Sequence, residues 1–402
     1  MQTPTISSDF PGGSGMGFSR WAAAKPWPRL ASGLEIPFAN FREKTQMPDT
    51  VRAFGRGIAA ALAEFLASPA AIYLGCYTDD AHPDGLFVLD LDPATGTMRV
   101  VGSLPVKGAT YQALSPDGRL LLSGTTTGLA SFRADGPRLE PIDALDLGGS
   151  VCHVSLAPDA RTAYWADYLG GRAGSVALDA DGRFGAVRAW QHEGDGPNKP
   201  RQDKAHCHQA LPAPDGRGFY VVDLGLDRVV RYPDGLVIPT PPPGAGPRHM
   251  LFHPNGSLGF LLYELGNRLA SFRIRPDGAF DFLDAKPTLP PGDTGRGYNG
   301  DLAAAIRLSP DGRRVVISNR GENSLLAFDF DPATGALVPG MRTILPGSWP
   351  RDFIFVSDTL ALVTMERSGE VLSLRYDPAT GSFEVLSALS GLFRPVALTL
   401  AP

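Results

Sequence analysis

The sequence predicts an all-β fold built from a repeated unit of roughly 40 to 55 residues, the size of a propeller blade. One phrase recurs between apolar, β-rich runs, as Ser115-Pro116-Asp117-Gly118-Arg119, Ala157-Pro158-Asp159-Ala160-Arg161, Ala213-Pro214-Asp215-Gly216-Arg217, His253-Pro254-Asn255-Gly256-Ser257 and Ser309-Pro310-Asp311-Gly312-Arg313. A second phrase, Asp-Pro-Ala-Thr-Gly, begins at Asp92, Asp331 and Asp377.

Both phrases have the composition of tight turns. Pro presets φ, Asp or Asn caps its own backbone, and Gly accepts a positive φ. We expect the first phrase to join the two inner strands of a blade. The second follows alternating runs such as 325–330, which is typical of the hairpin between the two outer strands.

Placing these turns along the chain gives a seven-bladed β-propeller of four-stranded antiparallel blades. Residues 72–107 contain only three strands, whereas 395–400 form a single strand without a blade. The two fragments should complete one blade and close the ring. Inner strands are expected to start near Tyr111, Cys152, His206, Arg248, Ala304 and Arg351.

Composition narrows the class of protein. The chain has 402 residues, is 43% hydrophobic and carries a net charge of −5, which argues against nucleic acid or an anionic membrane as the main partner. Its three cysteines, Cys76, Cys152 and Cys207, are an odd number spread over different blades. A reducing, cytoplasmic location is therefore expected, with a monomer or small homo-oligomer as the assembly.

Residues 1–69 do not fit the repeat. We expect an N-terminal arm there, rich in Gly, Pro and Ser up to Met47, with a short helix over 49–68 whose apolar residues fall on one face. A signal peptide is the weaker alternative, because the run is internal and broken by Glu64. The propeller domain is expected to cover 70–402.

Strand direction predicts where the polar residues meet. In each blade the start of the first strand and the end of the second lie at the same mouth of the central channel, opposite the Pro-Asp-Gly turns. First-strand starts supply Tyr111, His153, His206, His208, Arg248, His249, Arg351 and Asp352. Second-strand ends supply Asp167, Asp223, Asp227, Glu264, Asn319, Arg320 and Glu366. Polar groups converging on a concave mouth favour a small-molecule site.

Several strings at this mouth resemble one enzyme family. They are Lys204-Ala205-His206-Cys207-His208-Gln209, Val222-Asp223-Leu224-Gly225-Leu226-Asp227-Arg228, Gly246-Pro247-Arg248-His249, Tyr263-Glu264-Leu265 and Ser318-Asn319-Arg320-Gly321. Together they look like the seven-bladed lactonases, which include propeller-type 6-phosphogluconolactonases and carboxy-cis,cis-muconate cycloisomerases. The resemblance covers roughly 70–402, and it implies that His206 or His208, Arg248, Glu264 and Arg320 form the reaction site. Relatives often place an acid where Ala305 stands here.

The chemistry of lactone opening suits the same residues. Glu264 or a neutral His208 could activate water, while Arg248 and Arg320 could stabilise the oxyanion or bind an anionic group of the substrate. We therefore expect a lactone hydrolase acting on a small sugar-acid lactone such as 6-phosphogluconolactone, without a cofactor or metal. The catalytic candidates are His208, Arg248, Glu264 and Arg320, and the substrate-binding candidates are His153, His206, His249 and Arg351.

Alternative interpretations remain open. His206 and His208 could bind a metal with Asp223 or Asp227, or His206 could only bond a neighbouring blade. Arg248 and Glu264 could form a structural salt bridge. Two other functions compete with hydrolysis: a lactone-forming carboxymuconate cycloisomerase, and a noncatalytic interaction scaffold. The charged groups and imidazoles at the mouth favour an enzyme over a scaffold, whose surface would be richer in apolar anchors.

Overall fold

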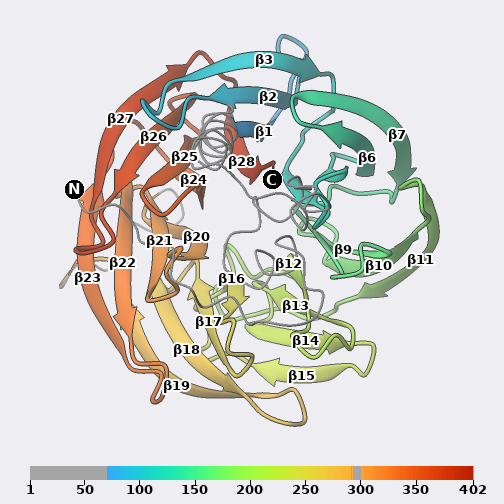
Figure 1. Ribbon diagram of the computed structural model, residues 1–402. Helices are drawn as coiled ribbons and strands as arrows, with labels where there is room; N and C mark the ends of the chain where they lie inside the picture. Colours follow the sequence, from blue (N-terminus) through green and yellow to red (C-terminus); the bar gives the residue numbers. More distant parts are fainter. Residues whose placement is uncertain (1–69, 291, 293–299, 402) are drawn as a thin grey trace, which may run out of the picture. The chain divides into compact units, whose positions relative to one another are not determined.

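The computed structural model describes residues 70–290, 292 and 300–401. Their 28 strands form seven four-stranded antiparallel sheets, which confirms the predicted propeller. Figure 1 shows the sheets following one another around a central axis, in the order of the chain. The expectations for residues 1–69, including a helix over 49–68, lie outside the described residues. In the described part of the chain, no helix has the length and apolarity needed to cross a membrane.

The blades are numbered from the one that contains the first described strand, and each has four strands from the axis outward. The innermost strands of blades 1 to 7 are β28 (Pro395–Leu400), β4 (Tyr111–Leu114), β8 (His153–Leu156), β12 (Cys207–Pro212), β16 (Pro247–Phe252), β20 (Leu302–Leu308) and β24 (Pro350–Phe355). The second strands are β1 (Ala70–Cys76), β5 (Leu120–Gly124), β9 (Thr162–Asp167), β13 (Phe219–Asp223), β17 (Leu258–Tyr263), β21 (Arg314–Arg320) and β25 (Leu360–Met365).

The outer half of each blade is a hairpin. The third strands are β2 (Leu86–Leu91), β6 (Gly128–Asp135), β10 (Arg172–Leu178), β14 (Arg228–Tyr232), β18 (Arg268–Ile274), β22 (Ser324–Phe330) and β26 (Glu370–Tyr376). The outermost strands are β3 (Met98–Leu104), β7 (Arg138–Asp146), β11 (Phe184–Gln191), β15 (Leu236–Pro239), β19 (Phe280–Pro287), β23 (Leu337–Ile344) and β27 (Phe383–Ser390).

The ring closes as the sequence predicts. Strand β28 pairs antiparallel with β1, with Leu398 opposite Leu74 and Thr399 opposite Tyr73. The last strand of the chain is therefore the innermost strand of blade 1. Asp352 of blade 7 adds a bond across this joint, because its Oδ2 accepts the backbone N–H of Leu398. Without this pairing, the edges of β1 and β28 would both be left without a hydrogen-bonded neighbour.

The repeated phrases form the predicted turns. In the first of them, Asp117 Oδ1 accepts the backbone N–H of Arg119, and Gly118 has a φ of 73°. The equivalent position of blade 3 is Ala160, which adopts a φ of 53° without the freedom of glycine. Each Asp-Pro-Ala-Thr-Gly phrase lies between the third and fourth strands of its blade. The turn chemistry thus separates the inner pair of strands from the outer pair.

Packing between blades holds the ring together. Among the described residues there are seven buried apolar clusters, one at each interface between neighbouring blades. At the interface of blades 4 and 5, for example, Tyr220 and Val222 pack with Met250 and Leu261. Because both faces of a blade are covered, a second strand such as β17 is buried along its whole length. These interfaces fix the positions of the strand ends around the channel.

Candidate active site

A pocket of about 550 Å³ opens at the mouth of the channel opposite the Pro-Asp-Gly turns. Its walls come from strand starts, strand ends and inter-blade connections. The lining residues are Tyr77, Thr110, Ser150, Cys152, Tyr168, Leu169, Arg201, His208, Glu264, Leu302, Arg320, Trp349, Arg351, Glu366, Arg367 and Arg394. Five guanidinium groups therefore face two carboxylates, and the pocket is electropositive although the chain as a whole is acidic.

Three of the candidate residues lie at β-bulges. The pairing of β12 with β13 shifts between Cys207 and Gln209, which leaves His208 as the extra residue. In the same way β16 shifts around Arg248, and β24 shifts around Arg351. A bulge bends the strand and re-aims a side chain, and such irregularities are common next to active sites. The same position of three inner strands is thus used to place a polar side chain at the channel mouth.

Glu264 directly follows β17 and is the charge centre of the pocket. Its Oε2 lies 3.0 Å from Arg248 Nε and 2.7 Å from Arg320 Nη2, and its Oε1 lies 2.5 Å from Arg201 Nη2. Only 2% of the Glu264 residue is exposed. Burial alone would raise the pKa of this carboxyl, but Arg320, Arg201 and Arg248 hold the pKa well below its usual range. Glu264 is therefore ionised, and its carboxylate holds the guanidinium groups of three arginines together.

Arg248 and Arg320 are fixed further by backbone carbonyls. Arg248 donates to Ala304 O, and Arg320 donates to Leu302 O and Ala303 O. Burial and the nearby Arg320 lower the pKa of Arg248 to about 9, so its guanidinium still carries a charge at neutral pH. A buried cation held in one orientation is suited to stabilising charge that develops on a substrate oxygen.

His208 lies beside this cluster and is neutral. Burial, followed by the charge of Arg248, lowers the pKa of His208 well below 6.5. Its Nδ1 has no hydrogen-bond partner among the described residues. The imidazole instead contacts two rings edge-on, with centroid distances of 5.4 Å to Tyr168 and 5.1 Å to His249. A neutral imidazole that lines a pocket can accept a proton from a bound water molecule.

A second carboxylate in the pocket lining, Glu366, also pairs with two arginines. Glu366 Oε2 lies 3.1 Å from Arg351 Nη1, and Arg394 donates to Glu366 Oε1. Burial would raise the pKa of Glu366, but Arg351 and Arg394 lower it below its usual value. Both guanidinium groups also lie over the ring of Tyr77, at 5.5 Å for Arg351 and 4.4 Å for Arg394. The pocket therefore has two acid-centred arginine clusters.

Comparisons with known proteins agree with this geometry. Residues 71–398 match the family model described as lactonase, 7-bladed beta-propeller. The chain belongs to this lactonase family. It is 28% identical over 347 residues to the 6-phosphogluconolactonase of Bacillus subtilis, covering 81% of this chain and 97% of the relative. A 6-phosphogluconolactonase of Formosa agariphila is 26% identical over 78% of this chain and 95% of its own length.

A solved structure shows the same architecture. The periplasmic gluconolactonase PpgL of Pseudomonas aeruginosa superposes with a TM-score of 0.77 at 27% identity, covering 83% of this chain and 99% of the other. The named relatives differ in whether the gluconolactone in their names is phosphorylated. The predicted family and fold are confirmed. Which lactone this enzyme hydrolyses has to be argued from the residues of its pocket.

The structure brings some of the candidate residues of the lactonase together and separates others. His208, Glu264, Arg320 and Arg351 line the pocket, and Arg248 lies behind Glu264. The remaining three candidates lie elsewhere and are described next.

His206, His249 and His153 lie away from the pocket lining. His206 Nδ1 lies 2.9 Å from Tyr168 O, and its Nε2 lies 3.0 Å from Asp203, so it ties two blades together. His249 lies deeper in the channel, with ring centroids 5.1 Å from His208 and 5.6 Å from His153. His153 lines a separate cavity that extends along the inner strands to the turn-side prolines Pro116 and Pro158.

The pocket also contains residues that strand direction alone does not predict. Arg201 lies in the long connection between β11 and β12, and Arg394 lies in the connection that leads to β28. Arg367 and Trp349 lie in turns next to β25 and β24. Nothing in the sequence marks these four residues except that an arginine or tryptophan occurs in a connection or turn near a strand.

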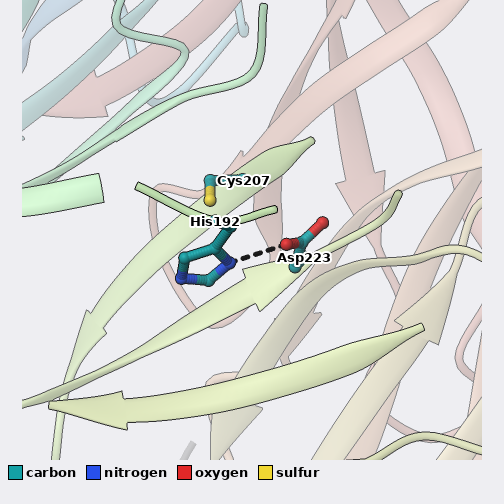
Figure 2. Close-up of side chains that lie close together, drawn as sticks. All are labelled: His192, Cys207 and Asp223. Atoms are coloured by element: carbon teal, nitrogen blue, oxygen red, sulfur yellow. Dashed lines mark hydrogen bonds and ion pairs between the residues drawn. The ribbon is translucent and has the colours of Figure 1, made fainter. Parts of the chain in front are cut away.

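A buried cluster between blades 3 and 4 contains Asp223, one of the two aspartates of the metal alternative for His206 and His208. The ligand-type atoms of His192, Cys207 and Asp223 lie within 4.8 Å of one another. Figure 2 shows the three side chains close together. Both nitrogens of His192 are already used, because Nδ1 lies 2.6 Å from Asp223 Oδ2 and Nε2 lies 2.9 Å from Tyr232 Oη. Asp223 Oδ1 accepts the backbone N–H groups of 206, 225 and 226. This hydrogen-bond network anchors the entry to β12, so Asp223 has a structural role here.

The three channel histidines predict a stability change with pH. Burial lowers the pKa of His153 to about 3, and it lowers those of His208 and His249 well below 6.5. Because the folded pKa lies below the unfolded value, the unfolded chain binds more protons, so stability is present above pH 6.5 and is lost as pH falls. Between pH 7.5 and 5.5 the expected loss is roughly 1.4 kcal/mol for each histidine and about 4 kcal/mol in all.

Urea unfolding at the two pH values measures this loss. His249→Gln should reduce the difference by about one third, since one of the three titrating groups is removed. A free energy of unfolding that is equal at pH 7.5 and 5.5 would contradict the assignment of these histidines as neutral in the fold.

Proposed function

We propose that this lactonase hydrolyses the lactone of a small sugar acid that carries an anionic group, with 6-phosphogluconolactone as the first candidate. The observation that carries the proposal is Glu264 held by three arginines beside the neutral His208, in a pocket lined by five guanidinium groups. The relatives named as 6-phosphogluconolactonases support the same substrate.

The proposed mechanism begins with water. The pocket-facing nitrogen of His208 accepts a proton from a water molecule, whose oxygen attacks the lactone carbonyl carbon. Arg320 uses Nε and Nη2 for Leu302, Ala303 and Glu264, and among the described residues its Nη1 has no acceptor, so Nη1 is placed to bind the oxyanion. When the ring C–O bond breaks, the imidazolium returns the proton to the leaving alkoxide. The products are one carboxylic acid and one hydroxyl group.

Glu264 has a supporting part in this mechanism. Two cations contact its Oε2 and one contacts its Oε1, and the pKa of the carboxyl is held well below its usual range, so it is a poor proton acceptor at neutral pH. Its negative charge raises the pKa of His208 against the effect of burial and thus stabilises the imidazolium when it forms. Of the two bases that the sequence leaves open, His208 is the one we favour.

A panel of substrates tests the function. Hydrolysis rates above the spontaneous rate are measured for 6-phosphogluconolactone and glucono-1,5-lactone, and ring closure is measured for carboxymuconate. We expect the highest kcat/KM for 6-phosphogluconolactone, unchanged after dialysis against a chelator. Preferential cyclisation of carboxymuconate would instead establish the cycloisomerase, and no turnover of any member would contradict the proposal.

We also propose that the lactonase is a cytoplasmic protein. Cys76, Cys152 and Cys207 are free thiols, which supports a reducing compartment such as the cytoplasm.

A further inference from the structure

The arginines of the pocket differ in how they are held. Arg201, Arg248 and Arg320 pair with Glu264, while Arg351 and Arg394 pair with Glu366. Such pairing fixes their orientation and neutralises part of their charge.

Arg367 is the exception among the pocket-lining arginines of the described chain. It follows Glu366 directly, it is exposed, and its guanidinium has no carboxylate or carbonyl partner within the described residues. Its guanidinium instead stacks on an aromatic ring, with the guanidinium carbon 3.2 Å from the ring centroid of Trp349. Within the described residues, Arg367 is therefore the pocket arginine whose guanidinium N–H groups are all left for a ligand.

Trp349 is held rigidly in an uncommon conformation. Its φ is 75°, a region that bulky residues rarely adopt and that is found most often at functional sites. The backbone N–H of Trp349 donates to Asn323 Oδ1, and its carbonyl accepts the N–H of Glu366. The preceding carbonyl, Ser348 O, accepts the N–H of Arg367. These bonds lock the indole and the turn that carries Arg367 to each other.

The indole also connects Arg367 to the reaction centre. The Arg320 guanidinium carbon lies 5.5 Å from the Trp349 ring centroid, so the same ring contacts an arginine of the Glu264 cluster and the rim arginine. A guanidinium stacked on a ring keeps its N–H bonds in its own plane, where they can form two parallel bonds to an anion. A substrate whose carbonyl lies at Arg320 therefore has a cation within reach on the rim side of Trp349.

We propose that Arg367, positioned by Trp349, binds a phosphate or carboxylate group at the end of the substrate away from the lactone carbonyl, and so determines which lactones the enzyme prefers. This inference rests on the proposed hydrolysis and adds the residue that recognises the anionic group. Arg367 binds substrate and takes no part in proton transfer. Its loss should therefore act on KM for anionic substrates and leave kcat nearly unchanged.

The test compares kcat and KM of full-length wild type and Arg367→Gln on 6-phosphogluconolactone and glucono-1,5-lactone. For the phosphorylated lactone we expect KM to rise by about 10- to 100-fold, the range for one hydrogen-bonded charge contact. For the uncharged lactone KM should change by less than about threefold. Arg188→Gln, on the exposed outer strand β11, removes the same charge away from the pocket and should leave both substrates unaffected.

Three outcomes decide between explanations. Equal losses on both lactones, or no loss on either of them and none on a third lactone that carries a carboxylate in place of the phosphate, overturn the role of Arg367. A loss confined to a carboxylated lactone, with 6-phosphogluconolactone unaffected, supports the anion role and identifies a carboxylate as the group. Calorimetric binding of 6-phosphogluconate keeps the two proposals separate: if neither lactone is hydrolysed but Arg367→Gln weakens this binding, hydrolysis is rejected and the anion site stands.

Discussion

His208→Gln is expected to lower kcat for lactone hydrolysis by about 10²- to 10⁴-fold, the usual contribution of a general base. Glutamine keeps a polar group in the pocket but cannot accept the proton of the attacking water. KM should change little, because the arginines that we propose bind the substrate are still held by Glu264 and Glu366. Steady-state kinetics on 6-phosphogluconolactone, corrected for spontaneous hydrolysis, gives both constants.

His206→Gln is the matched control for this substitution. His206 has the same side chain two residues earlier, but it bonds to Tyr168 O and Asp203 and does not line the pocket. We expect its kcat to stay within about threefold of wild type, since its bonds to a neighbouring blade are structural. If the two variants lose activity equally, or if His208→Gln keeps full activity, His208 is not the base.

Glu264→Gln is expected to reduce the free energy of unfolding by about 3–5 kcal/mol, the cost of leaving buried charges without a counterion. Arg201, Arg248 and Arg320 would then repel one another around a neutral amide. Activity should fall by at least about 100-fold, because the oxyanion-binding arginines lose their common anchor. Urea unfolding at pH 7.5 and lactone kinetics measure the two effects.

Glu384→Gln makes the same chemical change at an exposed pair. Glu384 lies 2.8 Å from Arg375, and both side chains are more than half exposed. Its loss should alter the free energy of unfolding by less than about 1 kcal/mol. A Glu264→Gln variant as stable as Glu384→Gln would show that the arginine cluster does not depend on this carboxylate.

The blades and their closure could be predicted because turns have local chemistry. Pro-Asp-Gly and Asp-Pro-Ala-Thr-Gly specify a backbone conformation within five residues, and their alternation gives the order of strands. The unpaired strand at 395–400 then has only one place in a closed ring, beside β1. Residues 1–69 lie outside both these patterns and the part of the chain that the structure describes.

Strand direction alone predicts which residues lie at the mouth of the channel, and it predicts nothing more about the site. That rule places Glu264 and Arg320 at the mouth because they end second strands. It does not give the depth of a side chain in the channel, so it groups His153 and His249 with residues that lie nearer the opening. It also does not reveal the bulges that re-aim His208 and Arg351, since a bulge depends on pairing with the neighbouring strand.

Arg201 and Arg394 were missed for a different reason. Both lie in connections between blades, outside the strand ends that the rule considers, and their roles arise from long-range pairing with Glu264 and Glu366. At Ala305, where the resemblance to the family led us to note an acid in relatives, the structure has a fully buried alanine in the core between blades 6 and 7.

The pH dependence of kcat for 6-phosphogluconolactone tests the central claim most directly, because it reports the protonation of the base in the enzyme–substrate complex. Burial beside Arg248 holds the pKa of His208 well below 6.5, so the imidazole is neutral throughout the neutral range. The account predicts that kcat stays level from pH 8 to pH 6.5 and falls only at lower pH. A kcat that halves near pH 6.5, as for an ordinary solvent-exposed histidine, or that rises as pH falls, would contradict a neutral His208 as the base.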